Sequence, residues 1–114
     1  LHRVDCVVDC GLAVNPDSIK AQMEGAIVMG ASATLFEQIS IKDGRVVESN
    51  FDDYRIARMK DTPKIVVSIV KSESSPTGIG EPGAAPIFPA ITNAIFAATR
   101  KRVRKLPIGK QMLV

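Results

Sequence analysis

One acidic side chain, Glu81, stands in the glycine- and proline-rich stretch SPTGIGEPGAAP, residues 75–86. The three glycines of this stretch permit backbone conformations closed to other residues, and they allow a ligand to approach the chain closely. Pro82 disfavours a helical conformation for the residue before it. The pattern therefore predicts a carboxylate held in place on a tight loop that a ligand can reach.

A carboxylate in this position has three possible roles. It can act as a general base, which is most effective in a buried setting, or as a metal ligand, or it can cap the helix that follows through the helix dipole. The residues of the loop alone leave these roles open. GIGEPG is neither GxGxxG with a downstream acid nor GxxxxGK followed by Ser or Thr, so nucleotide phosphate binding has weak support.

Few other side chains suggest chemistry. Gln22, in QMEG, has an amide that donates and accepts hydrogen bonds, which can be satisfied inside a helix interface. We expect Glu24 to pair with a cation or the backbone, and His2, the only histidine, to be exposed or structural. Cys6 and Cys10 lack the further ligands of a zinc or iron–sulfur site, and we expect two small buried hydrophobes.

The elements that position these residues begin with a strand over residues 2–9, which is rich in valine. Asn15 followed by proline predicts an N-cap and a helix that runs to about Gln38. Each glycine inside a helix lowers its propensity by up to ~1 kcal/mol. We therefore expect this long helix to be buried, with Gly25 and Gly30 packed closely against another backbone or a ligand.

Downstream, Asp43-Gly44 predicts the turn of a hairpin between residues 39–41 and 45–47. KIVVSIV, residues 64–70, predicts a second strand, and a helix should begin near Pro86 or Pro89 and end around Lys101. This order predicts an α+β fold with a mixed or antiparallel sheet, one long buried helix and a C-terminal helix. Residues 1–114 are expected to form a single domain or subdomain.

The composition, with 46% hydrophobic and 24% charged residues, is that of an ordinary globular chain. No apolar stretch approaches the ~18–20 residues that cross a bilayer, so the chain is not expected to be transmembrane. It does not begin with Met, which is compatible with a piece of a longer protein. The net charge of +3 reflects a basic tail, in which RKRVRK, residues 100–105, lacks interleaved aromatics. This run predicts a solvated helix end or a subunit contact rather than nucleic-acid binding.

Three segments at ordered spacing carry a resemblance to a known family. They are DCGLAVNPDSIKAQMEGAIVMG, NFDDYRIARM, and GIGEPGAAPIFPAITNAIFAAT followed by a basic run and LPIG. Together they resemble the C-terminal end of the molybdenum-binding large subunit of the xanthine dehydrogenase and aldehyde oxidase family, nearest to the isoquinoline 1-oxidoreductase beta subunits. One departure is Arg100, where this branch usually has a glycine that would cap the helix.

The resemblance implies a fragment of a larger molybdenum-binding domain, with molybdenum held by a molybdopterin-type cofactor, commonly the cytosine dinucleotide in bacteria. It implies hydroxylation of an N-heteroaromatic or aldehyde substrate with oxygen from water. Glu81 would be the general base, Gln22 and Gly80 would bind the cofactor, and no metal ligand would come from this chain. The implied partners are the N-terminal remainder of the large subunit and a small subunit with [2Fe–2S] clusters. The compartment stays open between bacterial cytoplasm and periplasm.

Two rival functions remain. A non-catalytic binding or assembly module would keep the fold without metal, and the metal content of the complete complex distinguishes it. A metal-independent hydrolase based on the glutamate fits poorly, because the sequence shows no paired carboxylate and no nucleophile–base pair at plausible spacing. As a piece of a molybdenum hydroxylase, the isolated fragment is expected to be inactive.

Overall fold

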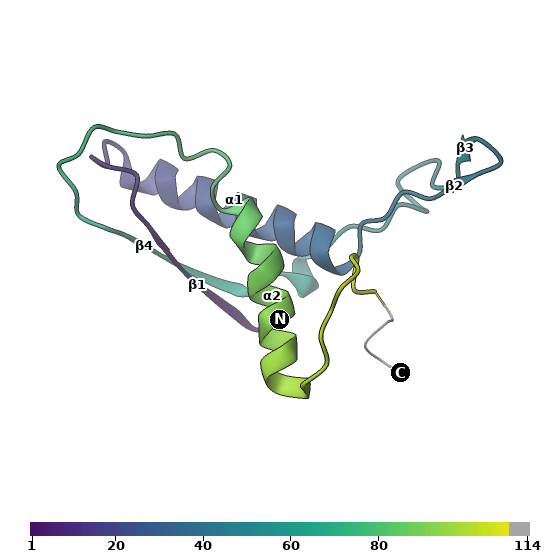
Figure 1. The fold of residues 1–114 in the computed structure, drawn as a ribbon. Helices are drawn as coiled ribbons and strands as arrows, with labels where there is room; N and C mark the ends of the chain where they lie inside the picture. The colour runs from purple at the N-terminus through teal and green to yellow at the C-terminus, as the bar shows by residue number, and fades with distance from the viewer. Residues whose placement is uncertain (110–114) are drawn as a thin grey trace.

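The computed structural model describes residues 1–109 of the chain. Its elements, in chain order, are β1 (Arg3–Val8), α1 (Pro16–Leu35), β2 (Ile41–Lys42), β3 (Arg45–Val46), a short 3-10 turn (Met59–Asp61), β4 (Lys64–Ile69) and α2 (Ala84–Thr99). Strands β1 and β4 lie beside the two helices, and the β2–β3 hairpin projects from them as an arm (Figure 1). The predicted α+β class is confirmed.

The strands form two separate two-stranded sheets. β1 and β4 are parallel, with Arg3 opposite Lys64 and Val8 opposite Ile69, whereas β2 and β3 are antiparallel. The predicted mixed or antiparallel sheet is therefore wrong for the β1–β4 pair, which forms a separate parallel sheet. Parallel strands need a long crossover connection, and α1 with the arm supplies it here. The predicted hairpin is confirmed, and Asp43 and Gly44 have φ values of 51° and 73°, as its two-residue turn requires.

Helix α1 begins where the sequence predicts, because the Asn15 side chain accepts a hydrogen bond of 3.1 Å from the Ser18 backbone N–H. It ends at Leu35, three residues before the predicted end. The prediction of a buried helix is correct for one face only. That face carries Ile19, Met23, Ile27 and Ala31. The other face is largely exposed, because the β1–β4 sheet and α2 both pack on the first face.

The two helices approach closely through small residues. A Cβ atom on Gly30 would collide with the Ile87 side chain and would lie 2.9 Å from the Ala84 carbonyl oxygen. A Cβ atom on Gly83 would lie 2.9 Å from the Ala26 side chain. The close-packing prediction for Gly30 is confirmed. For Gly25 no such contact is present within residues 1–109, because nothing lies within 4 Å of its added Cβ on the exposed face.

The core consists of two hydrophobic clusters between the sheet and the helices. One contains Ile27, Ala31, Ile87, Ile91 and Ile108, and the other contains Val8, Cys10, Ile19 and Met23. Both cysteines are free, Cys10 is buried, and partial burial raises the pKa of the Cys6 thiol. Within residues 1–109, no helix is both long enough and apolar enough to span a membrane.

Candidate functional site

The loop that carries Glu81 connects the end of β4 to the start of α2 and is fastened to the turn after β1. The Leu12 N–H donates to the Ser74 carbonyl at 2.9 Å, and the Thr77 N–H donates to the Cys10 carbonyl at 2.9 Å. These two backbone hydrogen bonds join the loop to the end of the β1 strand. The glycine-rich loop is therefore anchored along its first half.

Gly11 makes this junction possible. Its φ of +73° lies in the left-handed region, and a Cβ atom there would overlap the Ser75 carbonyl oxygen. The Asp9 carboxylate accepts a hydrogen bond of 3.0 Å from the Gly11 N–H, which supports the turn. The sequence did not suggest this role for Asp9 and Gly11, although both lie in the segment DCGLAVNPDSIKAQMEGAIVMG. The signal was a glycine in the turn that follows the strand, because a glycine adopts a positive φ readily.

Glu81 lies two residues before Gly83, the N-cap of α2. Its backbone carbonyl accepts a hydrogen bond of 3.0 Å from the Ala84 N–H. The N-cap is Gly83, and no side chain caps the helix. The carboxylate is exposed and makes no hydrogen bond or ion pair with any other residue of the described chain. The helix-capping role for the Glu81 side chain is therefore not what the structure shows.

The backbone next to Glu81 is open. Gly78 and Gly80 are exposed, and a Cβ atom on either would meet nothing within 4 Å. Together with Glu81, Pro82 and Ala85 they line a shallow depression of ≈ 510 Å³. A planar ligand could approach the peptide groups of this loop without meeting a side chain.

Gln22 lies on the exposed face of α1 and lines a second depression, of ≈ 280 Å³. Thr77 and Ile79, from the Glu81 loop, line the same depression. The loop therefore lines two depressions, one that it shares with Gln22 and one that contains Glu81. The structure brings Gln22 to the loop but does not place it in one depression with Glu81. Because Gln22 is exposed, the alternative of an amide satisfied inside a helix interface is wrong within residues 1–109.

The other polar candidates have no evident part in the site. Glu24 and His2 are exposed, and the expected pairing of Glu24 with a cation or the backbone is not seen in the described chain. No three His, Cys, Asp or Glu side chains gather as metal ligands in residues 1–109. A metal at the Glu81 loop would therefore be held by a cofactor or by residues outside this range.

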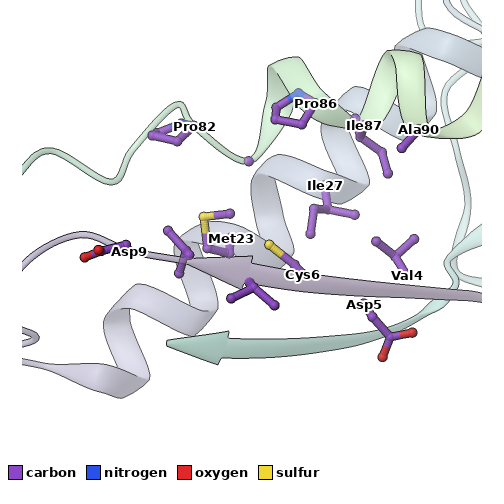
Figure 2. A pocket seen from close by; sticks show the side chains of 13 residues that line it. Val4, Asp5, Cys6, Asp9, Met23, Ile27, Pro82, Pro86, Ile87 and Ala90 are labelled. Atoms are coloured by element: carbon purple, nitrogen blue, oxygen red, sulfur yellow. The ribbon is translucent and has the colours of Figure 1, made fainter. Parts of the chain in front are cut away.

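A third cavity was not anticipated from the sequence. It is a groove of ≈ 360 Å³ between β1 and the start of α2, with Met23 and Ile27 of α1 between them (Figure 2). Pro82 and Gly83, directly after Glu81, line its other side. The groove therefore adjoins the candidate site.

The arrangement of the strands and helices matches part of two larger enzymes of known structure. Quinoline 2-oxidoreductase from Pseudomonas putida 86 superposes with a TM-score of 0.77 at 27% identity, over 94% of this chain and 15% of that chain. The reconstituted CO dehydrogenase from Oligotropha carboxidovorans gives 0.79 at 21% identity, over 94% and 14%; at that identity the likeness shows the fold alone. The fold is thus that of a fragment of a larger domain found in these enzymes.

Residues 1–63 match the model of the molybdopterin cofactor-binding domain, and the chain belongs to this family. The isoquinoline 1-oxidoreductase subunit beta of Brevundimonas diminuta is 42% identical over 108 residues, which are 95% of this chain and 14% of that protein. The membrane-bound aldehyde dehydrogenase [pyrroloquinoline-quinone] of Gluconacetobacter polyoxogenes is 42% identical over 107 residues, 94% and 14%. The chain spans about one-seventh of the length of these curated relatives. The resemblance drawn from the three motifs is confirmed.

The two kinds of match differ on the cofactor. The name of the second relative specifies pyrroloquinoline quinone, whereas the family model describes molybdopterin binding. The family model describes the cofactor-binding domain itself and covers more than half of this chain, so the sequence of this chain supports molybdopterin.

Proposed function

We propose that residues 1–114 form the C-terminal portion of the molybdopterin-binding domain of a molybdenum hydroxylase. The enzyme hydroxylates an N-heteroaromatic or aldehyde substrate with oxygen derived from water, and Glu81 acts as the general base. The observation that carries this proposal is a carboxylate without a partner in residues 1–109, on an anchored glycine loop, in a member of the molybdopterin domain family.

The residues at the loop fit such a cofactor. A pterin carries donors and acceptors along its ring edges, and the exposed Gln22 amide offers both kinds of group. At Gly80, the open space around the backbone allows peptide groups to reach a flat ligand. Gln22 and Gly80 would therefore hold the cofactor, in the cytosine dinucleotide form. When bound, the cofactor supplies a redox-active metal that activates water and accepts electrons.

Glu81 takes up a proton at a carboxylate oxygen in this mechanism. Pro82 and the two backbone hydrogen bonds of the loop limit its movement, which keeps the acceptor oriented toward the reacting group. Residues 1–109 leave the carboxylate exposed, whereas proton transfer is favoured where water is excluded. The cofactor, the substrate and the rest of the polypeptide would supply that cover. Electrons leave through a separate small subunit with [2Fe–2S] clusters.

The first test replaces Glu81 with glutamine in the complete enzyme. The amide keeps the size of the side chain but cannot accept the proton, so turnover should fall by roughly 10²- to 10⁴-fold while molybdenum content stays unchanged. Glu73→Gln is the matched control, because Glu73 is an exposed acid on the same loop. Near-normal turnover of the Glu81 variant would contradict the assignment.

The second test concerns cofactor retention. Gln22→Ala should lower the molybdenum that remains bound after gel filtration, because the variant loses an amide that holds the cofactor. Gln38→Ala, at an exposed glutamine beyond the end of α1, should leave the content unchanged. A complete complex that contains no molybdenum would instead favour a non-catalytic assembly module.

A further inference from the structure

Only one edge of β1 is paired within residues 1–109. The Lys64 N–H donates to the His2 carbonyl at 3.0 Å, and the Val70 N–H donates to the Val8 carbonyl at 2.8 Å. Successive residues of a strand direct their backbone groups to opposite edges, so the even-numbered residues of β1 face β4. The N–H and C=O groups of Asp5, Val7 and Asp9 therefore face the other edge, where the described chain places no strand.

The groove between β1 and α2 lies along this free edge. Residues 4–9 line one side and Pro82, Pro86 and Ala90 line the other, with Met23 and Ile27 between them (Figure 2). Its lining is mostly apolar side chains, and a row of backbone donors and acceptors runs along one wall. An extended peptide that adds to a sheet edge uses these two features, main-chain hydrogen bonds and adjacent side-chain pockets.

We propose that an extended segment of the same polypeptide, upstream of Leu1, occupies this groove as a third strand beside β1. This proposal rests on the proposed function in one respect, that the chain is part of a longer large subunit. The chain covers 14% of its curated relatives, so ample polypeptide lies outside it. Parallel sheets are almost always covered and rarely consist of two strands alone.

The positions of the chain ends favour an upstream segment. Leu1 lies two residues before β1, at one end of the groove wall. The last described residues are held elsewhere, because the Ile108 N–H donates to the Thr34 carbonyl at 2.8 Å and the Gly109 N–H donates to the Leu35 carbonyl at 3.0 Å. Both bonds fasten them to the C-terminal end of α1.

Strand addition here would act on the candidate site. Pro82 and Gly83, which line the groove, follow Glu81 directly. A segment packed against them would fix the start of α2 and contribute to the cover that residues 1–109 do not give Glu81.

Hydrogen exchange of the full-length polypeptide tests the proposal. The amides of Val7 and Asp9 should exchange at least ~100-fold more slowly than unprotected amides. The amide of Val8, which faces β4, should be protected in any case and serves as the reference. Exchange of Val7 and Asp9 at the unprotected rate would overturn the proposal. The measurement is repeated on protein produced without molybdenum, where the same protection is expected. A failed assignment of Glu81 would leave this result unchanged, so the two failures are distinguishable.

A pair of variants isolates the edge. Val7→Pro removes the outward N–H while the bonds between β1 and β4 remain, and Val7→Ala keeps that N–H but removes most of the side chain, which is 72% exposed. Proline should abolish protection of the upstream segment and leave that of β4 intact, whereas alanine should change neither. Equal effects of the two variants would contradict pairing through the backbone.

A cross-link identifies the occupant even if the proline variant fails to fold. Ala90 is exposed on the groove wall and is replaced by the photoreactive benzoylphenylalanine in the full-length protein. The expected adduct joins this position to a peptide upstream of Leu1 in the same chain. Adducts to a second copy or to a separate subunit would overturn the proposal.

Discussion

Arg100 ends α2 in a conformation that suits glycine better than arginine. Its φ and ψ of 62° and 6° are left-handed, and its N–H donates to the Phe96 carbonyl at 2.8 Å, which closes the last turn. The side chain that stacks on the Phe96 ring, at 3.8 Å from its centre, belongs to Arg102 instead. Arg100→Gly should therefore stabilise the end of α2 without removing a described side-chain contact.

The expected gain follows from two opposing effects. The left-handed conformation is unfavourable by about 1–2 kcal/mol for a residue with a Cβ atom, and glycine avoids this. Glycine in turn has more freedom to lose on folding, which offsets about 0.4–1 kcal/mol. The net stabilisation is about 0.5–1 kcal/mol, or roughly a 2- to 5-fold smaller opening equilibrium, since 1.36 kcal/mol corresponds to tenfold.

Amide exchange at residues 97–100 of the intact polypeptide measures this change. Arg100→Gly should slow exchange there by the stated factor. Arg100→Ala, which keeps the Cβ atom, should leave it close to that of the parent chain. If alanine slows exchange as much as glycine, the left-handed conformation is not the cause. Faster exchange in the glycine variant would refute the reasoning.

Three further predictions concern the scaffold. Gly30→Ala should destabilise the contact of α1 with α2 by about 1–3 kcal/mol through overpacking, while Gly25→Ala, on the open face, should stabilise α1 by up to ~1 kcal/mol; amide exchange along α1 compares them. Asn15→Ala removes the N-cap bond and should speed exchange in the first turn of α1 about 5-fold, for a loss of about 1 kcal/mol. Backbone N–H groups of residues 50 and 49 donate to Asp53 and lower the pKa of its carboxyl below 3.8. The ionised Asp53 carboxylate stabilises the turn fully at neutral pH, and this stabilisation is lost as pH falls through the lowered pKa. An NMR titration of Asp53 should therefore give a midpoint below 3.8.

Local signals in the sequence predicted local structure well. The start of α1 was predictable because an N-cap needs only a side-chain oxygen and the N–H three residues later. The hairpin was predictable because Asp43-Gly44 supplies the two positive φ values that its turn requires. The start of α2 was less accurate. Pro86 lies in the first turn of α2, where an N–H has no partner within the helix, but Pro89 lies inside the helix, where a proline removes one i→i−4 hydrogen bond.

Long-range relations were not predictable from one sequence. Nothing in KIVVSIV indicates that it pairs with residues 3–8, or that the pairing is parallel, because strand partners are chosen by packing rather than by propensity. The burial of α1 was overestimated for a related reason. The small residues on its outer face predict a neighbour, and within residues 1–109 α2 and the sheet cover only the face that carries Gly30.

The Glu81 loop depends both on local sequence signals and on a long-range contact. The glycines and Pro82 predicted a constrained carboxylate, but the constraint comes from the turn after β1, where Gly11 admits the Ser75 carbonyl and two backbone hydrogen bonds fasten the loop. Gly11→Ala should therefore displace the loop, although Gly11 carries no side chain that could take part in catalysis. In the complete enzyme it should lower kcat per bound molybdenum, as Glu81→Gln does. The pH dependence separates the two variants: a displaced base still titrates, whereas a glutamine at position 81 removes the ionisation from the kcat profile altogether. A Gly11 variant with unchanged kcat would show that the anchor does not position the carboxylate.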